Sequence, residues 1–342
     1  MNALLEKWET LKAENPHIRI RNAAQKLGVS EVELLATKTG KNVTRLRPEF
    51  KNILLDLEPL GRLMGLTRNN ECVHERKGVY SNGDFSNPHA GLFVNEDIDM
   101  RIFLSAWDKA YAVTEESEHG TRTSLQFFGK DGEAIHKVYL TKDSNEDAFW
   151  ALVEKYKSED QSTNETTVAI PLNLDEKPDS EVDLEEFHKA WKGLKDTHDF
   201  FGLLKKFGLT RTQALRLAPS EYYAQKIDNQ ASVKLLELAA ETKTPIMVFV
   251  GNRGNIQIHT GRIRKTMWHR EWFNVMDPDF NLHLDMSKIA STYIVRKPGD
   301  GDIVTSVEVF NEMGDLIVQF FGKRKPGIPE LEEWREIVKQ LA

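Results

Sequence analysis

The two halves of this 342-residue chain carry related sequences. Residues 123–140 (TSLQFFGKDGEAIHKVYL) align without a gap to residues 305–322 (TSVEVFNEMGDLIVQFFG). The identical pairs include Thr123/Thr305, Ser124/Ser306, Phe128/Phe310, Gly132/Gly314 and Ile135/Ile317. A period this long is not that of a solenoid, so it predicts one domain that was duplicated and fused. Each copy then serves as an internal reference for the other.

The repeat also shows where the two copies differ. GLTR occurs at 65–68 and at 208–211, and this register places His198 opposite Leu55. The register of the repeated strands sets these further pairs opposite each other: Arg101 and His283, Glu115 and Lys297, Lys137 and Gln319, Lys142 and Arg324. One composite site built from both halves would produce such polar differences, and so would simple drift.

Size and composition restrict the class of protein. With 40% hydrophobic residues, the chain can bury two cores of ordinary domain size. The single cysteine, Cys72, excludes a disulfide framework and a zinc knuckle. No apolar run reaches the roughly 18 residues of a membrane span, and the N-terminus lacks a signal-peptide core. We therefore expect a cytoplasmic protein, and the net charge of −7 argues against broad nucleic-acid binding.

The order of the periodic segments predicts an α+β fold. Each half has helices first, then antiparallel strands, then a final helix, which implies a large antiparallel β-sheet with flanking helices in each of two structurally repeated halves. The domains expected are residues 1–156 and 181–342, joined by a polar linker at 157–180. The segment from Leu60 to Leu66 is expected to begin a helix.

Residues 21–40 resemble a helix-turn-helix, with Gly28 in the turn and Ser30 as the cap of the second helix. DNA binding is one interpretation, and an ordinary helical corner packed on the sheet is the other. Glu31 and Glu33 open the second helix, where acidic groups would repel phosphates. The helical corner is therefore the favoured interpretation.

Among the ten histidines, His198 has the most distinctive setting. It lies in KDTHDFFGLLKKFGLTR, where Asp196 or Thr197 can cap a helix that runs to Gly208. The positive end of the helix dipole disfavours an imidazolium there, and a metal requires a neutral imidazole. Phe200, Phe201 and Phe207 would add apolar surface nearby. An exposed histidine without a ligand role remains the alternative.

Several long segments together identify a family. KDTHDFFGLLKKFGLTRTQALRLAP, MRIFLSAW, VFVGNRGNIQIHTG, NLHLDM, YIVRKPGDGDIVTSVEVFNEMG and VQFFGKRKPGIPELEEW resemble the cytoplasmic haem-utilisation proteins of Gram-negative bacteria, the HemS-like hemin-degrading factors. The match runs in order over nearly the whole chain. It implies two repeated halves with non-covalent b-type haem held in a cleft between them.

The resemblance also implies roles for individual residues. His198 corresponds to the axial ligand of the haem iron. Arg101 corresponds to a distal arginine on the opposite haem face, where it would hold a water or hydroxide, because a guanidinium has no lone pair to give. The remaining positions line the haem slot or meet its propionates: Phe103, Phe201, Lys297, Gln319, Phe320 and Arg324.

Two functions share this expected site. A haem carrier would accept haem arriving through an inner-membrane ABC importer and pass it to an acceptor such as haem oxygenase. A haem-degrading enzyme would instead open the porphyrin with Arg101 at the reaction centre and an external reductant, since no flavin or nicotinamide fingerprint is present. Trafficking is the preferred hypothesis, and a DNA-binding regulator is the third and weakest.

Overall fold

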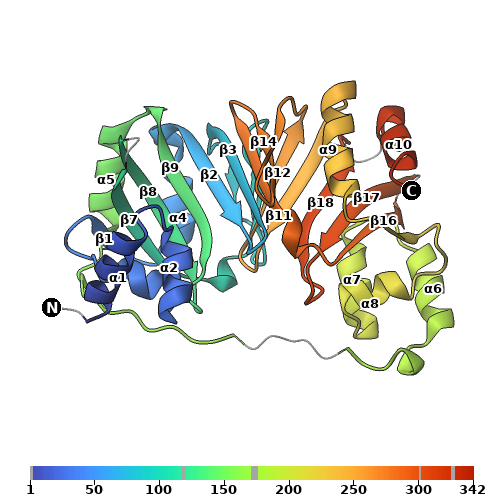
Figure 1. Ribbon diagram of the computed structural model, residues 1–342, viewed down its shortest axis with the longest axis horizontal. Coiled ribbons are helices and arrows are strands. Elements are labelled where there is room, and N and C mark those ends of the chain that lie inside the picture. The colour runs from blue at the N-terminus through green and yellow to red at the C-terminus, as the bar shows by residue number, and fades with distance from the viewer. Residues whose placement is uncertain (1–2, 118–119, 171–175, 300–301, 325–327) are drawn as a thin grey trace. The chain divides into compact units, whose positions relative to one another are not determined.

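The computed structural model describes residues 3–117, 120–170, 176–299, 302–324 and 328–342 (Figure 1). The chain divides into two compact units. We call them the N-terminal unit (Met1–Arg68, Glu75–Pro171 and Gly251–Gln257) and the C-terminal unit (Asn69–His74, Leu172–Val250 and Ile258–Ala342). Each contains antiparallel sheet flanked by helices, which confirms the expected α+β class. No helix among the described residues is long and apolar enough to cross a membrane.

The main sheet of the N-terminal unit has the strand order β1-β7-β8-β9-β2-β3, and β4, β5 and β6 form a short antiparallel meander. One face of the main sheet packs on α4 and α5, and the other packs on α3. The strands are β1 Val43–Leu46, β2 Gly61–Arg68, β3 Cys72–Val79, β4 Gly83–Asp84, β5 Gly91–Val94, β6 Asp99–Ile102, β7 Trp107–Ser117, β8 Gly120–Gly129 and β9 Ala134–Ser144. The helices are α1 Ala3–Glu14, α2 Ile20–Leu27, α3 Glu31–Ala36, α4 Phe50–Leu55 and α5 Glu146–Tyr156, with 3₁₀ turns η1 Glu58–Leu60 and η2 Leu104–Ala106.

The C-terminal unit repeats this plan with the order β10-β16-β17-β18-β11-β12 and the meander β13-β14-β15. Helices α9 and α10 cover one sheet face, while α6, α7 and α8 gather on the other (Figure 1). The strands are β10 Ala224–Ile227, β11 Ile246–Gly251, β12 Asn255–Gly261, β13 Thr266–His269, β14 Trp272–Met276, β15 Phe280–Asp285, β16 Ser291–Pro298, β17 Ile303–Phe310 and β18 Leu316–Gly322. The helices are α6 Leu184–Lys192, α7 Asp199–Phe207, α8 Arg211–Arg216, α9 Ala231–Thr242 and α10 Glu332–Lys339, with η3 Asp179–Glu181 and η4 Met286–Lys288.

The repeated hairpin adopts the same turn in both units. Gly132 and Gly314 both have φ of 78°, in the left-handed region that disfavours a side chain. The register of each hairpin shifts at the same place, between Phe127 and Phe128 in one copy and between Val309 and Phe310 in the other. The identical glycines therefore mark a shared backbone requirement.

The helical pairs before the sheets are also equivalent, and they correct the register that GLTR suggested. Gly28 and Gly208 are left-handed caps that follow α2 and α7. Ser30 and Thr210 then cap α3 and α8 by accepting from the backbone three residues later. Because this offset is 180 residues, His198 lies opposite Ile18, and the pairing with Leu55 is wrong. The first GLTR lies within β2, so the shared tetrapeptide is a coincidence.

The helix-turn-helix segment is packed into the N-terminal unit. Glu31, at the start of α3, is only 2% exposed and forms an ion pair with Lys137. Val32, Leu34 and Leu35 on the same helix are buried. These contacts agree with a helical corner on the sheet, because the first turn of a recognition helix must be accessible to base edges.

The helix expected from Leu60 to Leu66 is wrong, because this segment forms β2. Its apolar residues happen to follow helical spacing, yet they pair in register with β9. A side chain at Gly65 would collide with the hydroxyl of Tyr80. Short apolar runs of this kind fit a strand or a helix equally well, so long-range pairing decides.

Much of the expected polar linker is anchored, although residues 171–175 lie outside the described part. Arg45 donates hydrogen bonds to Ser162 and Asn164 and forms an ion pair with Glu165. At the other end, Glu176 accepts from Thr210 and forms an ion pair with Arg216. The polar residues of this linker thus bind the N-terminal unit at one end and the C-terminal unit at the other.

Each unit is completed by a short segment from the other half of the sequence. Asn252 donates to the carbonyl of Ile135 at 2.8 Å in the N-terminal unit. Asn69 likewise donates to the carbonyl of Ile317 at 2.8 Å in the C-terminal unit. The two turns are equivalent in the repeat, so the exchange is reciprocal. A single cut in the sequence therefore does not reproduce the compact units.

We expect Gly132→Ala and Gly314→Ala each to lower the free energy of unfolding by about 1–2 kcal/mol, because both turns need a left-handed residue. Gly202→Ala is the matched control. Gly202 lies in α7 with open space around its Cα, so the added methyl should stabilise the protein by roughly 0.5–1 kcal/mol. Urea unfolding measures all three variants. Unchanged stability in both turn variants would contradict the shared strained turn.

Candidate functional site

The start of α7 presents His198 at the surface of the C-terminal unit. The helix begins at Asp199, and Phe200 anchors it by packing edge-on against Trp191, with ring centroids 4.8 Å apart. The side chain of His198 is 88% exposed. A well-packed first turn thus carries an imidazole that is available to a ligand.

Asp196 holds this imidazole from the preceding turn. Its Oδ1 accepts from the backbone N–H of His198 at 2.8 Å and lies 2.5 Å from Nδ1 of the same residue. The pKa of the Asp196 carboxyl is held below its ordinary value, chiefly by the backbone hydrogen bond and further by His198 and the charge of Arg324. Nε2 of His198 makes no hydrogen bond to the described residues. The predicted cap at Asp196 or Thr197 is wrong, because His198 itself is the N-cap of α7 and no side chain caps the helix. Asp196 orients the imidazole ring instead.

The three phenylalanines near His198 have different roles. Phe200 and Phe207 pack in the core that α6, α7 and α8 form with the sheet. Phe201 is 75% exposed beside His198. Only Phe201 therefore offers open apolar surface at this helix start.

A buried charge cluster lies beneath the same helix. Glu308 on β17 is fully buried and accepts two hydrogen bonds from Arg211 on α8, at 2.7 and 2.8 Å. It also accepts from Lys297 on β16 at 2.6 Å and from Gln319 on β18 at 3.0 Å. Lys297 lies 4.5 Å from the ring centroid of Phe200. The cluster thus connects the sheet to the helix that carries His198.

The cluster contains one more positive than negative charge, and its pKa values reflect this. Burial raises the pKa of Glu308, but Arg211 and Lys297 outweigh burial and hold it well below its usual range. Burial lowers the pKa of Lys297 to about 8, and the positive charge of Arg211 adds to this against the attraction of Glu308. Burial is thus the main cause of the lowered pKa of Lys297, and the shared carboxylate offsets it only in part.

Strand alternation places Gln319 and Phe320 on opposite faces of the sheet, although the family resemblance placed both in the haem site. Gln319 faces the cluster, whereas Phe320 is fully buried on the other face against α9 and α10. Phe321 returns to the face of Gln319 and packs against Phe249 with ring centroids 4.9 Å apart. Phe249 and Phe321 are thus partly exposed aromatic residues on this face, and Phe320 belongs to the core.

Arg101 and Phe103 belong to the N-terminal unit. Arg101 on β6 is partly exposed and forms an ion pair with Asp99. Burial raises the pKa of the Asp99 carboxyl, and the charge of Arg101 opposes this shift. Phe103 is partly exposed, and its backbone N–H donates to the carbonyl of Gly254 at 2.9 Å.

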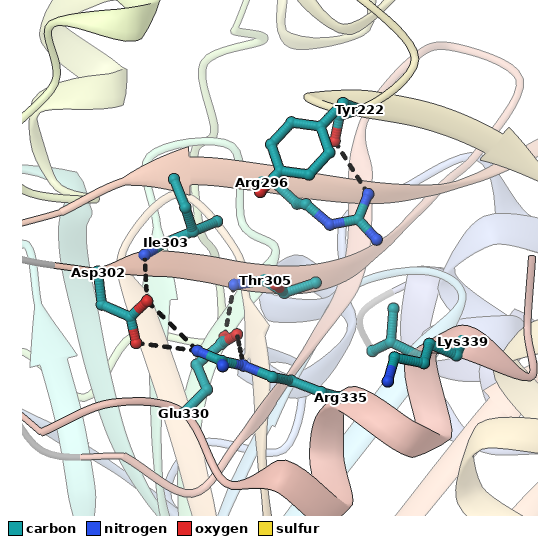
Figure 2. A pocket seen from close by; sticks show the side chains of 9 residues that line it. Tyr222, Arg296, Asp302, Ile303, Thr305, Glu330, Arg335 and Lys339 are labelled. Atoms are coloured by element: carbon teal, nitrogen blue, oxygen red, sulfur yellow. Dashed lines mark hydrogen bonds and ion pairs between the residues drawn. The ribbon is translucent and has the colours of Figure 1, made fainter.

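A polar pocket of about 300 Å³ lies elsewhere in the C-terminal unit, beside α10 (Figure 2). Arg335 forms ion pairs with Asp302 and Glu330, and Arg296 donates to the carbonyl of Tyr222. Figure 2 shows Arg335 lying between the two carboxylates. The charged walls of this pocket do not match the apolar lining of most small-molecule sites.

Comparison with known proteins identifies the family. The model of the haemin-degrading HemS.ChuX domain matches residues 28–156 and 208–341. This chain belongs to that family. Both matched segments begin at the equivalent glycines, Gly28 and Gly208.

The relatives extend over the whole chain. The hemin transport protein HmuS of Yersinia pestis is 39% identical, covering 100% of this chain and 98% of HmuS. The hemin transport protein HemS of Yersinia enterocolitica is 37% identical, covering 99% and 97%. The structure of holo-PhuS, a heme-binding protein from Pseudomonas aeruginosa, superposes with a TM-score of 0.96 at 46% identity, covering 99% and 98%. ChuS, an E. coli heme oxygenase, has a TM-score of 0.89 at 33% identity, covering 100% and 99%.

The sequence did not single out Glu308, Arg211 or Phe321. A signal was nevertheless present, since Glu308 is the one charged residue in the segment VTSVEVF, and a buried charge requires partners. Strand alternation would also have assigned Phe321 to the face of Gln319. The partner of Glu308 on α8 lies 97 residues away and was not readable.

The two buried lysines should differ in their contribution to stability. Lys137→Met leaves the buried Glu31 without its nearest cation, and we expect a loss of about 3–5 kcal/mol. Lys297→Met leaves Glu308 bound to both nitrogens of Arg211, so the loss should be about 1 kcal/mol or less. Urea unfolding at neutral pH compares them. Equal losses would contradict the idea that Arg211, rather than Lys297, is the main partner of Glu308.

Lys297 should also give stability a distinctive dependence on pH. Its pKa in the folded protein is about 8, below the value of about 10.4 for a lysine in the unfolded chain. Between these values the unfolded state binds more protons, so stability contributed by this group rises with pH. The wild type should therefore gain stability relative to Lys297→Met between about pH 8 and 10. A constant difference in unfolding free energy across that range would contradict this prediction.

Proposed function

We propose that this chain is a cytoplasmic haem-binding protein of bacterial haem-iron acquisition. The observation that carries the proposal is the exposed imidazole of His198, with Nδ1 held by Asp196 and Nε2 open. Family membership supports it, and so do relatives named for hemin transport and heme binding.

The donor set fits haem better than a bare metal ion. The described residues contain no group of three or more His, Cys, Asp or Glu side chains that could hold a metal ion. A porphyrin supplies four equatorial nitrogens, so haem iron needs only one protein nitrogen on a given face. His198 would supply that nitrogen, and Phe201, Phe249 and Phe321 are partly or fully exposed aromatic surfaces in the same unit.

The cations near His198 suit the propionates of haem. Lys297 and Arg211 share one carboxylate, which leaves a net positive charge beneath α7. Arg324 is close enough to lower the pKa of Asp196. Because charge-assisted hydrogen bonds to carboxylates are strong, Arg324 would hold a propionate, whereas Lys297, buried against Glu308, would act through its charge.

Arg101 and Phe103 would cover the opposite face of the haem, as the family resemblance implies. Arg101 stays protonated and cannot coordinate iron, so it would orient a water or hydroxide through hydrogen bonds. The sixth position would remain exchangeable. An exchangeable position suits a carrier that releases its cargo.

A haem-degrading enzyme is the second candidate. ChuS is described as a heme oxygenase, and it is 33% identical to this chain over its full length. The same exchangeable position would admit a small ligand, with Arg101 beside the reaction. An external reductant would supply the electrons.

The proposed partners follow from the cargo. Haem would arrive from an inner-membrane ABC importer and leave to an acceptor such as haem oxygenase. A DNA-binding function through residues 21–40 ranks below both candidates, because Glu31 is buried against Lys137.

Titration of the purified protein with hemin, followed by absorbance, tests the proposed ligand. The wild type should saturate at one haem per chain with a histidine-ligated ferric spectrum. His198→Ala should lose that spectrum and bind at least about 10-fold more weakly, because it lacks the axial nitrogen. His269→Ala is the control, since His269 is an exposed histidine of the same unit.

If wild type and His198→Ala titrate alike, His198 is not the ligand. Adding a reductant such as ascorbate to the loaded protein then separates the two functions. A persistent Soret band with transfer to apo-myoglobin supports the carrier. Bleaching with release of iron supports the enzyme.

A further inference from the structure

We propose that Asp196 is a positioning residue that sets the tautomer and orientation of His198, so that Nε2 is the nitrogen offered to a ligand. Its effect on haem rests on the function proposed above. Its effect on the imidazole does not, and the two can be measured separately.

The geometry of one carboxylate oxygen carries the proposal. Oδ1 of Asp196 accepts the backbone N–H of His198 at 2.8 Å and also lies 2.5 Å from Nδ1. The backbone bond fixes the oxygen relative to the main chain of His198, and the contact with Nδ1 then fixes the ring. An ionised carboxylate only accepts hydrogen bonds, so Nδ1 must carry the proton. In the neutral imidazole, Nε2 then keeps its lone pair.

The backbone of Asp196 is itself held in place. The backbone N–H of Asp196 donates to Oδ2 of Asp199 at 3.2 Å, and the N–H of Asp199 donates to the carbonyl of Asp196 at 3.1 Å. These reciprocal bonds close the turn immediately before α7. The imidazole is therefore oriented by its own turn, although the side chain is 88% exposed.

The other copy of the repeat lacks the device. With the offset of 180 residues set by Gly28 and Gly208, Pro16 lies opposite Asp196 and Ile18 opposite His198. The Asp196 carboxylate and the His198 imidazole thus occur together in one copy and are both absent from the equivalent positions of the other. The helix that both copies share therefore does not require them.

A carboxylate behind a ligating histidine changes its chemistry as well as its direction. It fixes the ring and raises the basicity of the ligand, and removing it commonly weakens metal binding by roughly 10- to 100-fold. It should also favour the oxidised metal, because a more basic imidazole donates more electron density. We therefore expect Asp196 to strengthen ferric haem binding and to lower the reduction potential.

The first measurement uses the protein without haem. Nitrogen-15 shifts of the His198 ring at about pH 8.5, above the ordinary pKa of imidazole, report which nitrogen carries the proton. The wild type should show a proton on Nδ1. Asp196→Ala should move the proton to Nε2 or leave a mixture, whereas Asp196→Asn should keep it on Nδ1, because the amide oxygen still accepts.

Asp199→Asn is the matched control, since it removes the same charge from the same turn without a contact to the imidazole. It should leave the ring shifts unchanged. A proton on Nδ1 in Asp196→Ala would overturn the proposal, whatever that variant does with haem. Far-ultraviolet circular dichroism confirms that each variant is folded.

The second measurement adds hemin. Asp196→Ala should raise the dissociation constant by roughly 10- to 100-fold and shift the reduction potential upwards, with Asp196→Asn between it and the wild type. Asp199→Asn should remain within about 2-fold of the wild type. A tautomer change in Asp196→Ala together with unaltered hemin binding in His198→Ala would refute the proposed ligand while leaving the role of Asp196 on the ring intact.

Discussion

The buried carboxylate of Glu308 is the interaction on which the C-terminal unit depends. It receives Arg211, Lys297 and Gln319 from one helix and two neighbouring strands. Arg211 and Lys297 then lie 5.3 and 4.5 Å from the ring centroid of Phe200, which anchors the first turn of α7. Because a buried carboxylate without partners is costly, the strands and α8 must adopt one mutual position. The position of His198 follows from that arrangement.

The N-terminal unit solves the same problem with the charges exchanged. Equivalent positions carry Glu31 for Arg211, Gln126 for Glu308 and Lys137 for Gln319. The helix therefore supplies the carboxylate and the strand supplies the cation, joined as the buried pair of Glu31 and Lys137. Among the described residues, no arginine lies as close to the carboxylate of Glu31 as Arg211 lies to that of Glu308. Glu31 therefore raises the pKa of Lys137 despite burial. The two copies thus keep one polar centre under the helical pair and exchange which element supplies the carboxylate.

Local signals in the sequence predicted most of the fold. The repeated hairpin, the cap at Ser30 and most of the C-terminal helices follow from turn chemistry and periodicity. The wrong predictions share a physical origin, because the conformation of each segment is decided by residues outside that short segment. The segment 61–68 became a strand because β9 pairs with it, and GLTR misled because four residues do not encode their backbone conformation.

The candidate site shows the same division. His198 and its carboxylate are two residues apart, so the sequence contains the whole device. Glu308 and Arg211 are 97 residues apart, and only the fold brings them together. The resemblance placed both Gln319 and Phe320 in the haem site, although adjacent residues of a strand face opposite sides of the sheet. Applied to one strand, that rule alone would have selected Phe321.

Duplication explains why these two kinds of device coexist. The charge cluster occupies positions that both copies use for a polar centre, so it belongs to the shared architecture of the fold. The pair of Asp196 and His198 lies in the turn before the helix, where the other copy has Pro16 and Ile18. That turn lies outside the sheet and can change without altering its pairing. A ligand site could therefore arise in one copy at little cost to stability, and the second copy was free to contribute different side chains.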